Sequence, residues 1–256
     1  MEAKAGPVSS GDLLASLGTA RMPVLIDVRR APAFAAAETL IVGAIRRLPE
    51  DVERWKAALP HDRAITAYCI HGQEVSQGVA QALCAAGYDA SYLEDGITGW
   101  TERGLPTRRK RSPEPGKWIT RERPKIDRIA CPWLIRRFVD PEAEFLYVPA
   151  ADVLAAAARC GAIPYDIPGA EFGHRGDECS FDAFLRLYGI GDPALDRLAL
   201  IVRGADTGRL DLAPQSSGLL AVSHGLSMSF ADDHEMLERG MVVYDALYAW
   251  CRAQAG

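Results

Sequence analysis

Cys69 is the residue whose type and position point most clearly to chemistry. An apolar, β-prone run at residues 64–68 precedes it, a glycine-containing loop follows, and small and apolar residues at helical spacing then extend from Gln73 to Ala86. The N–H groups of such a loop and the N-terminus of the helix both favour negative charge, and therefore thiolate over thiol. We predict a nucleophilic cysteine in a substrate-binding loop. The loop residues are Ile70, His71, Gly72, Gln73, Glu74, Val75 and Ser76.

A second group of residues could bind a metal ion. Histidines and carboxylates gather in the second half of the chain, and the predicted ligands are Glu171, His174, Asp206 and His234. Imidazole together with carboxylates suits Zn, Fe or Mn. A divalent metal is therefore the expected cofactor of this half, whereas sulfur chemistry at Cys69 requires none. The spacing matches no strong metal motif, and helix caps and surface ion pairs are the alternative for these residues.

Two arginines near a predicted helix start suggest a different ligand. Apolar residues in the stretch 126–138 fall near one helical face. Pro132 fits best at the first helical position, which places Cys131 at the N-cap. Arg128 and Arg136 are close in sequence to this helix start. We predict that their guanidinium groups bind an oxyanion.

The elements around Cys69 predict where it must lie. In residues 1–107, short apolar stretches alternate with stretches of helical periodicity, which is typical of a parallel sheet with helices on both faces. Ligands of such sheets bind at the carboxyl ends of the strands, and Cys69 follows one of those ends. The second half contains mostly helical patterns and a few strand-like stretches, so a helix-rich α+β domain with a small sheet is expected there.

Length and composition set further bounds. A chain of 256 residues suggests two domains, and the charged segment 108–116, with its Pro and Gly, is the expected linker between domains 1–107 and 117–256. The net charge of -5 gives no reason to expect nucleic acid as a partner. No apolar run approaches the roughly 20 residues of a membrane span. The six cysteines are widely spaced, which predicts a reducing, cytoplasmic location.

The first half resembles the rhodanese family. The matching pieces are Leu25-Ile-Asp-Val-Arg29, Cys69-Ile-His-Gly72, the helix Gly78-Val-Ala-Gln-Ala-Leu83, and Glu94-Asp-Gly-Ile-Thr-Gly-Trp100 with Gly104-Leu-Pro106. The resemblance implies a rhodanese-like parallel sheet flanked by helices. It also implies that Cys69 accepts sulfane sulfur as a persulfide and passes it to a thiol or cyanide.

The loop after Cys69 departs from the sulfurtransferase pattern. It looks one residue longer, a length that resembles the phosphatase and arsenate-reductase branch of the family, but it contains no Arg or Lys and carries Glu74. A tetrahedral dianion would need a guanidinium here. We therefore predict neither phosphatase activity nor thiosulfate as the natural donor. The expected donor is a small neutral sulfur compound or a protein persulfide, and the expected acceptor is a thiol.

The second half resembles the C-terminal domain of the chromate resistance proteins. The matching runs are Lys125 to Phe138, Gly173 to Phe184, Arg203 to Arg209, and the helix of His234-Glu235 with Tyr244 to Tyr248. The resemblance implies a role in chromate resistance, with chromate as a candidate ligand. In that family the domain can follow a DNA-binding module. Here a rhodanese-like domain takes that place, so no repressor role is expected.

Two functional hypotheses follow. The leading one is a rhodanese-type sulfurtransferase, with Cys69 as nucleophile, coupled to a chromate-resistance domain and acting in chromate or thiol stress. The alternative is a metal- or oxyanion-binding sensor whose rhodanese-like domain is non-catalytic or reports redox state.

Overall fold

The structure, a computed structural model, describes residues 5–111 and 116–254, and these form two units. The first unit contains the described residues up to Lys110 together with Arg137–Pro141, and the second contains Arg111–Arg136 and the chain from Glu142 onward. The first unit is therefore built from two separate stretches of the sequence. Each unit has a hydrophobic core of its own.

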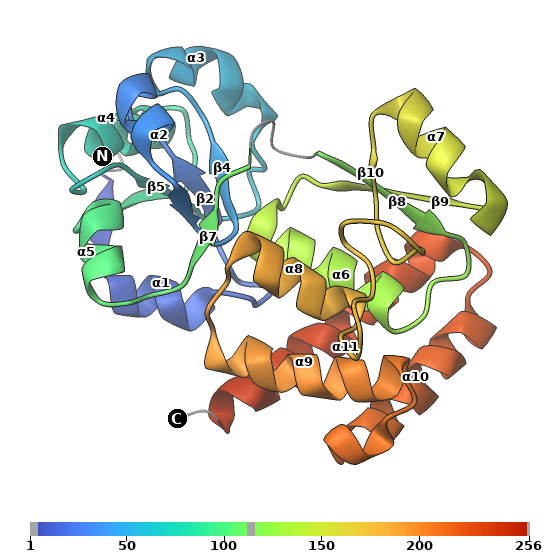
Figure 1. The fold of residues 1–256 in the computed structure, drawn as a ribbon. Helices are drawn as coiled ribbons and strands as arrows, with labels where there is room; N and C mark the ends of the chain where they lie inside the picture. Colours follow the sequence, from blue (N-terminus) through green and yellow to red (C-terminus); the bar gives the residue numbers. More distant parts are fainter. Residues whose placement is uncertain (1–4, 112–115, 255–256) are drawn as a thin grey trace. The chain divides into compact units, whose positions relative to one another are not determined.

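A parallel sheet forms the centre of the first unit (Figure 1). In the described part of the chain it has five strands in the order β1-β6-β5-β2-β4, and every neighbouring pair is parallel. Its strands are β1 (Gly6–Val8), β2 (Val24–Asp27), β4 (Ala44–Arg46), β5 (Ile65–Tyr68) and β6 (Ala90–Leu93). Strands β2 and β5 are buried along their whole length, as expected for central strands covered on both faces. This confirms the predicted fold class.

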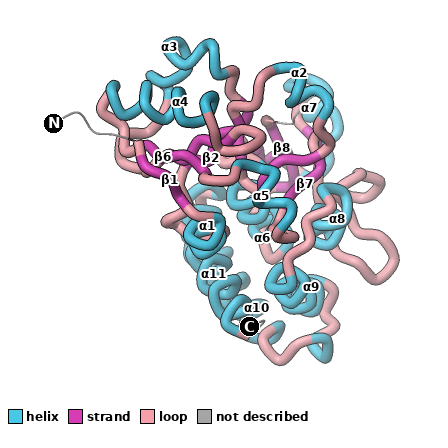
Figure 2. Tube along the Cα trace, turned by 90° about the vertical axis from the view of Figure 1, so that its left-hand side faces the viewer, coloured by secondary structure: helices cyan, strands magenta, loops and turns pink. Residues whose placement is uncertain are grey.

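Helices cover both faces of this sheet: α3 and α4 lie on one face, and α1 and α5 lie on the other (Figures 1 and 2). The helices are α1 (Ser10–Ser16), α2 (Ala31–Ala36), α3 (Val52–Trp55), α4 (Glu74–Ala85) and α5 (Gly96–Glu102), with short turns η1 (Pro49–Asp51) and η2 (Lys56–Ala58) beside α3. Helix α4 is amphipathic. Its buried residues Ser76, Val79, Ala80, Leu83 and Cys84 recur every three or four positions and so form one stripe facing the sheet.

A short antiparallel ladder corrects the predicted linker. Strand β3 (Thr39–Ile41) pairs with β7 (Thr107–Arg109), and Leu40 lies opposite Arg108. Arg108 is only 3% exposed, so this part of the basic run is structured and buried, not an exposed tether. Composition alone marks the segment as charged but cannot reveal a pairing partner almost 70 residues earlier. Residues 112–115 of the predicted linker lie outside the described residues.

The second unit has a small parallel sheet and many helices, as predicted. Where the structure describes it, the sheet has the order β10-β8-β9, with β8 (Lys117–Arg121), β9 (Glu144–Val148) and β10 (Ile163–Pro164). Trp118 on β8 packs edge-on against Phe172, with ring centroids 5.0 Å apart. The helices and turns are α6 (Asp127–Leu134), η3 (Ile135–Val139), η4 (Ala150–Asp152), α7 (Val153–Cys160), α8 (Ser180–Tyr188), α9 (Pro193–Asp206), η5 (Leu210–Leu212), α10 (Ser216–Ser229) and α11 (Asp233–Ala253).

Helix α6 begins earlier than the sequence predicts. It starts at Asp127, so Pro132 lies inside the helix and Cys131 is not at its N-cap. Seven of the eight residues of α6 are buried, and this burial outweighs the single backbone hydrogen bond that Pro132 cannot donate. Burial also raises the pKa of the Cys131 thiol well above its usual value. The predicted position of Cys131 at a helix N-cap is therefore wrong.

Among the helices described, none combines the length and the apolar character needed to cross a membrane.

Candidate active site and candidate metal centre

Cys69 lies between the end of β5 and the start of α4, with only 6% of its surface exposed. Its Sγ is 3.2 Å from the Oγ of Ser76. Burial alone would raise the pKa of this thiol, but the Ser76 hydroxyl and the backbone N–H groups of Ser76, Gln73 and His71 all bond to the sulfur and outweigh burial. The net effect is a lowered pKa. The loop thus stabilises a negative charge at sulfur through neutral donors.

A second loop holds the Cys69 loop in place. The N–H groups of Ile97 and Thr98, at the start of α5, donate to the carbonyls of Cys69 and Ile70 at 3.0 Å each. Those two carbonyls are therefore bonded to α5. The start of α5 lies so close to the Cys69 loop that a Cβ added to Gly96 would be 2.6 Å from the carbonyl oxygen of Cys69. This contact leaves no room for a side chain at position 96.

A pocket of about 620 Å³ opens beside the sulfur, lined by Cys69 and its loop and by Arg29 and Arg30 from the neighbouring loop after β2. The Arg29 guanidinium is 2.5 Å from the buried carboxylate of Asp27, which neutralises its charge. Arg30 is exposed at the rim, where Glu74 also lines the pocket. Sequence reasoning searched for a free cation only within the loop and missed Arg30. Because β2 and β5 are adjacent and parallel, their carboxyl ends meet, and the residues after β2 could have been included on that ground.

The seven predicted loop residues have different positions. Ile70, His71, Gln73, Glu74 and Val75 line the pocket. Ser76 is buried beneath it and reaches the sulfur through its hydroxyl. Gly72 has a positive φ of 67°, and a Cβ there would lie 2.0 Å from the carbonyl oxygen of Glu94. Gly72 therefore shapes the loop and does not line the pocket.

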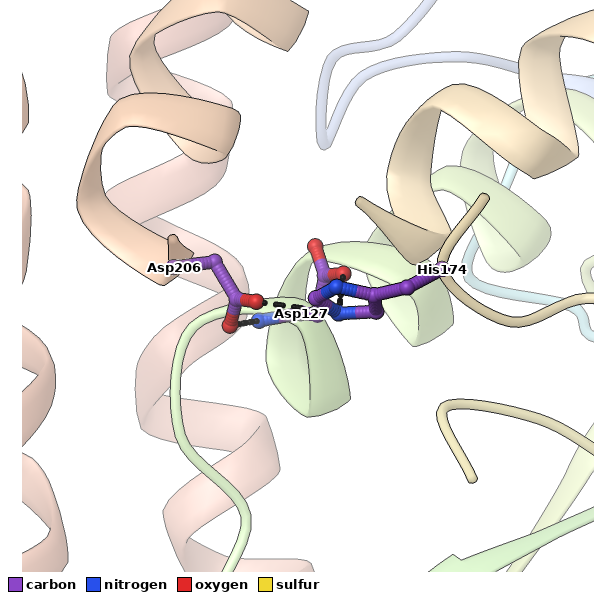
Figure 3. Close-up of side chains that lie close together, drawn as sticks. All are labelled: Asp127, His174 and Asp206. Atoms are coloured by element: carbon purple, nitrogen blue, oxygen red, sulfur yellow. Dashed lines mark hydrogen bonds and ion pairs between the residues drawn. The ribbon is translucent and has the colours of Figure 1, made fainter. Parts of the chain in front are cut away.

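In the second unit, one histidine lies among three aspartates. The Nε2 of His174 is 3.5 Å from the Oδ2 of Asp127, 3.3 Å from the Oδ1 of Asp166 and 3.1 Å from the Oδ2 of Asp206. Figure 3 shows Asp127, His174 and Asp206 converging from α6, from the loop before α8, and from the end of α9. Within the described residues, these three form the group whose possible ligand atoms all lie within 4.8 Å of one another.

Two of the four predicted metal ligands are brought together, and two are not. His174 and Asp206 meet in this cluster. Glu171 instead pairs with Arg111 at 2.9 Å, and the ring of His234 packs against Tyr147 with centroids 5.3 Å apart. Closeness in sequence and position at a helix start suggested these two, but each is satisfied by a partner of its own.

Asp127 and Asp166 were missed by sequence reasoning. Asp127 did carry a signal, because it lies four residues before Cys131 and seven before Leu134 and therefore shares their apolar helical face. A carboxylate on a buried face needs a partner. Asp166 carried no comparable signal, since it is in the loop after β10 and reaches the cluster only through the fold.

The predicted oxyanion site is not assembled. The Nε of Arg128 is 3.3 Å from Asp166, and the Arg136 guanidinium is 2.5 Å from Glu238. Each arginine therefore already pairs with a carboxylate, and the two pair with different ones. The contact of Arg128 with Asp166 instead makes it a neighbour of the aspartate cluster.

The charged groups of the cluster shift one another's pKa values. The carboxylates of Asp127, Asp166 and Asp206 accept hydrogen bonds from His174 and raise its pKa well above the usual value. Burial raises the pKa of Asp127, although its bond to His174 opposes this. The pKa of Asp166 is lowered because bonds from His174 and Ser180 outweigh its burial.

The sheet topology and the position of Cys69 define the first unit as a rhodanese-like domain, and the rhodanese-like family description matches residues 9–103. Residues 118–251, just over half of the chain, match the family described as "ChrB, C-terminal domain", and the chain belongs to that family. Both resemblances expected from the sequence are thus confirmed.

The chain is also similar to individual proteins. Over 135 residues the chain is 37% identical to Protein ChrB of Cupriavidus metallidurans, covering 52% of this chain and 40% of that protein. The chain therefore matches less than half the length of this relative. A full-length protein from Lactobacillus plantarum is 25% identical, with a TM-score of 0.38, and the likeness covers 41% of this chain and 88% of that one. A rhodanese-related protein from Thermoplasma volcanium is 22% identical, with a TM-score of 0.35, covering 40% and 96% respectively.

Proposed function

We propose that the rhodanese-like domain is a sulfurtransferase in which Cys69 carries a sulfane sulfur as a persulfide and delivers it to a thiol. The observation that supports this most is the ring of donors around the sulfur: the Ser76 hydroxyl and the N–H groups of Ser76, Gln73 and His71. These neutral donors favour the thiolate that must attack. They also favour the persulfide anion that forms, because its charge stays beside the same loop.

The proposed chemistry has two balanced steps. The Cys69 thiolate attacks the outer sulfur of a donor persulfide, forming the Cys69 S–S bond and breaking the S–S bond of the donor. The donor leaves as a thiolate. It then takes up the proton that the new persulfide on Cys69 loses, and the persulfide becomes an anion. An acceptor thiolate then attacks the outer sulfur on Cys69, forms a new S–S bond, and returns Cys69 to the thiolate.

The charges at the pocket support a donor of low charge. Arg29 is neutralised by Asp27, and the exposed Arg30 shares the pocket lining with the carboxylate of Glu74. A dianion such as thiosulfate would meet Glu74 without a dedicated, uncompensated guanidinium at the sulfur. A small persulfide, or the persulfide of a partner protein whose side chain enters the pocket, fits this balance better.

Because the chain belongs to the ChrB C-terminal family, we propose that the sulfur transfer acts in the response to chromate or to thiol stress, in the cytoplasm. The six free cysteines fit a compartment in which thiols stay reduced.

Persulfide loading tests the proposal. The full chain is incubated with glutathione persulfide and digested, and mass spectrometry is used to find the peptide that gains one sulfur atom. Cys69→Ser is expected to abolish loading and transfer to an acceptor thiol. Cys160→Ser removes an exposed thiol outside this pocket and is expected to leave both unchanged. Loading of the Cys69→Ser protein at the wild-type level would refute the assignment.

A further inference from the structure

We propose that Asp127, His174 and Asp206 form a binding site for a divalent transition-metal ion, beside which Asp166 supplies a further negative charge. This site belongs to the second unit and is independent of sulfur transfer at Cys69. The three ligand atoms come from the start of α6, the loop before α8 and the end of α9. Three parts of the chain far apart in sequence therefore direct polar atoms at one point.

The spacing of these atoms matches a coordination sphere. Two ligands about 2.1 Å from a metal, at octahedral or tetrahedral angles, are about 3.0–3.4 Å apart. The Nε2 of His174 is 3.5 Å from Asp127 and 3.1 Å from Asp206. The same spacing between a histidine and one acid would be an ordinary ion pair, so distance alone does not distinguish the two cases.

The number of acceptors does distinguish them. The single Nε2–H of His174 can point at one oxygen, yet carboxylate oxygens of Asp127, Asp166 and Asp206 all lie within 3.5 Å of that nitrogen. One proton cannot make three good hydrogen bonds. A cation near the same point would interact favourably with every one of these oxygens.

Asp127 gives an independent indication. Its side chain is completely buried, and its Oδ2 accepts a hydrogen bond from the N–H of Ser180. Its Oδ1 is also buried and has no hydrogen-bond partner among the described residues. A buried carboxylate with an unsatisfied oxygen is costly unless a cation compensates it. His174 contacts Oδ2 and leaves Oδ1 without a partner, so this carboxylate can still accept a cation.

The surroundings suit a metal that exchanges with solvent. His174 is 43% exposed and Asp206 is 19% exposed, which leaves one side open for water ligands. Asp166 is fixed by the hydroxyl of Ser180 at 2.9 Å and by Arg121 at 3.1 Å. Its Oδ2 also contacts Arg128 at 3.3 Å, so this oxygen is already held by cations. Its Oδ1 lies 3.3 Å from the Nε2 of His174, so Asp166 adds negative charge beside the site.

The ligand types indicate which metals bind. One imidazole and two carboxylates, without a thiolate, favour Mn²⁺ or Fe²⁺ and also accept Zn²⁺. Cys179 caps the helix next to the cluster, but its sulfur is not among the ligand atoms that converge there.

Manganese titration of the full chain tests the site. Protein stripped of metal with a chelator is titrated with Mn²⁺ alone, and free Mn²⁺ is followed by electron paramagnetic resonance. We expect one Mn²⁺ per chain, with a rise in the thermal unfolding midpoint. His174→Ala and Asp206→Asn are expected to weaken binding at least about tenfold.

Matched controls separate this site from nonspecific binding and from the proposed sulfur transfer. His234→Ala and Glu171→Gln change the same residue types outside the cluster and should bind Mn²⁺ as the wild type does, as should Cys69→Ser. Circular dichroism verifies that each variant is folded. The proposal is overturned if the wild type takes up no Mn²⁺, Fe²⁺ or Zn²⁺, or if folded His174→Ala and Asp206→Asn bind Mn²⁺ as tightly as the controls.

Discussion

At the scale of single residues, Cys69 and Cys131 show how differently burial acts on a thiol. Both are buried. Burial raises the pKa of Cys131, whereas the pKa of Cys69 is lowered because hydroxyl and backbone donors face its sulfur. The difference comes from the direction of nearby N–H and O–H groups, because the largest causes that lower the Cys69 pKa are these neutral donors.

Ser76→Ala tests this explanation through pH dependence. Because the pKa of Cys69 is lowered in the folded protein, its thiolate persists to a lower pH than that of an ordinary cysteine. Removing the Ser76 hydroxyl deletes one donor to the charged sulfur. The pH at which half of the Cys69 thiol is ionised should therefore rise by about one pH unit. The rate of alkylation by iodoacetamide against pH measures the midpoint, with Cys160→Ser in both proteins to remove the exposed thiol. An unchanged midpoint would show that the Ser76 hydroxyl does not contribute and that the backbone N–H groups alone lower the Cys69 pKa.

The residues of the two sites differed in how far the sequence could predict them. Cys69 and its loop could be predicted because the donors are local: they follow the cysteine within seven residues. His174 and Asp206 could be named as ligands by type, but their true neighbours Asp127 and Asp166 are brought in by tertiary packing. Glu171 and His234 were equally plausible by type and are instead bound to other partners.

At the scale of elements, two glycine-containing loops determine the Cys69 site. Gly72 in the loop before α4 and Gly96 at the start of α5 both have positive φ values, 67° and 57°. In both cases a Cβ would meet carbonyl oxygens of the other loop at 2.6 Å or less. The two loops therefore fit together only because both positions lack a side chain.

Gly72→Ala measures the contribution of this fit, with Gly87→Ala as the control. Gly87 also has a positive φ, of 88°, but a Cβ there would meet nothing within 4 Å. The control should lower the free energy of unfolding by about 1–2 kcal/mol from backbone strain alone. Gly72→Ala should cost a further 1–3 kcal/mol or so, because backbone atoms must shift, and should also slow persulfide loading. Urea denaturation compares the two variants. If both lose the same free energy of unfolding, the close contact between the two loops does not contribute to stability.

The elements of the first unit were largely predictable, and the exceptions share a cause. Strands and helices with their own periodicity, such as β5 and α4, followed from the pattern. The ladder of β3 with β7 did not, because it pairs two strands of only three residues each that are far apart in sequence. The start of α6 was misplaced because tertiary burial outweighed the local preference of Pro132 for a first turn.

At the scale of the whole molecule, the first unit includes a segment that the sequence assigned to the second domain. Residues 137–141 belong to the first unit, where the carbonyl of Phe138 accepts a hydrogen bond from the N–H of Gly43 at 2.7 Å. Phe138 and Val139 are fully buried. A boundary drawn at residue 108 or 117 therefore leaves the first unit without one of its parts.

Fragments of the chain test this boundary. A fragment of residues 1–110 lacks the segment, whereas a fragment of residues 1–141 contains it. We expect the shorter fragment to be less stable by about 1–3 kcal/mol, because the amide of Gly43 loses its partner and apolar surface is uncovered. Urea denaturation, monitored by far-UV circular dichroism, compares the two. Equal unfolding free energies would show that residues 137–141 contribute nothing to the first unit.

The position of residues 137–141 also affects the order of events while the chain is being made. A ribosome adds about 5–20 residues each second, so roughly 30 residues between the end of β7 and this segment take about 2–6 s to synthesise. During that time the parallel sheet can form around Cys69, but the amide of Gly43 has no carbonyl to bond. The N-terminal unit is complete only after α6 has been translated. The two units are thus linked in time during synthesis, even though each has its own core.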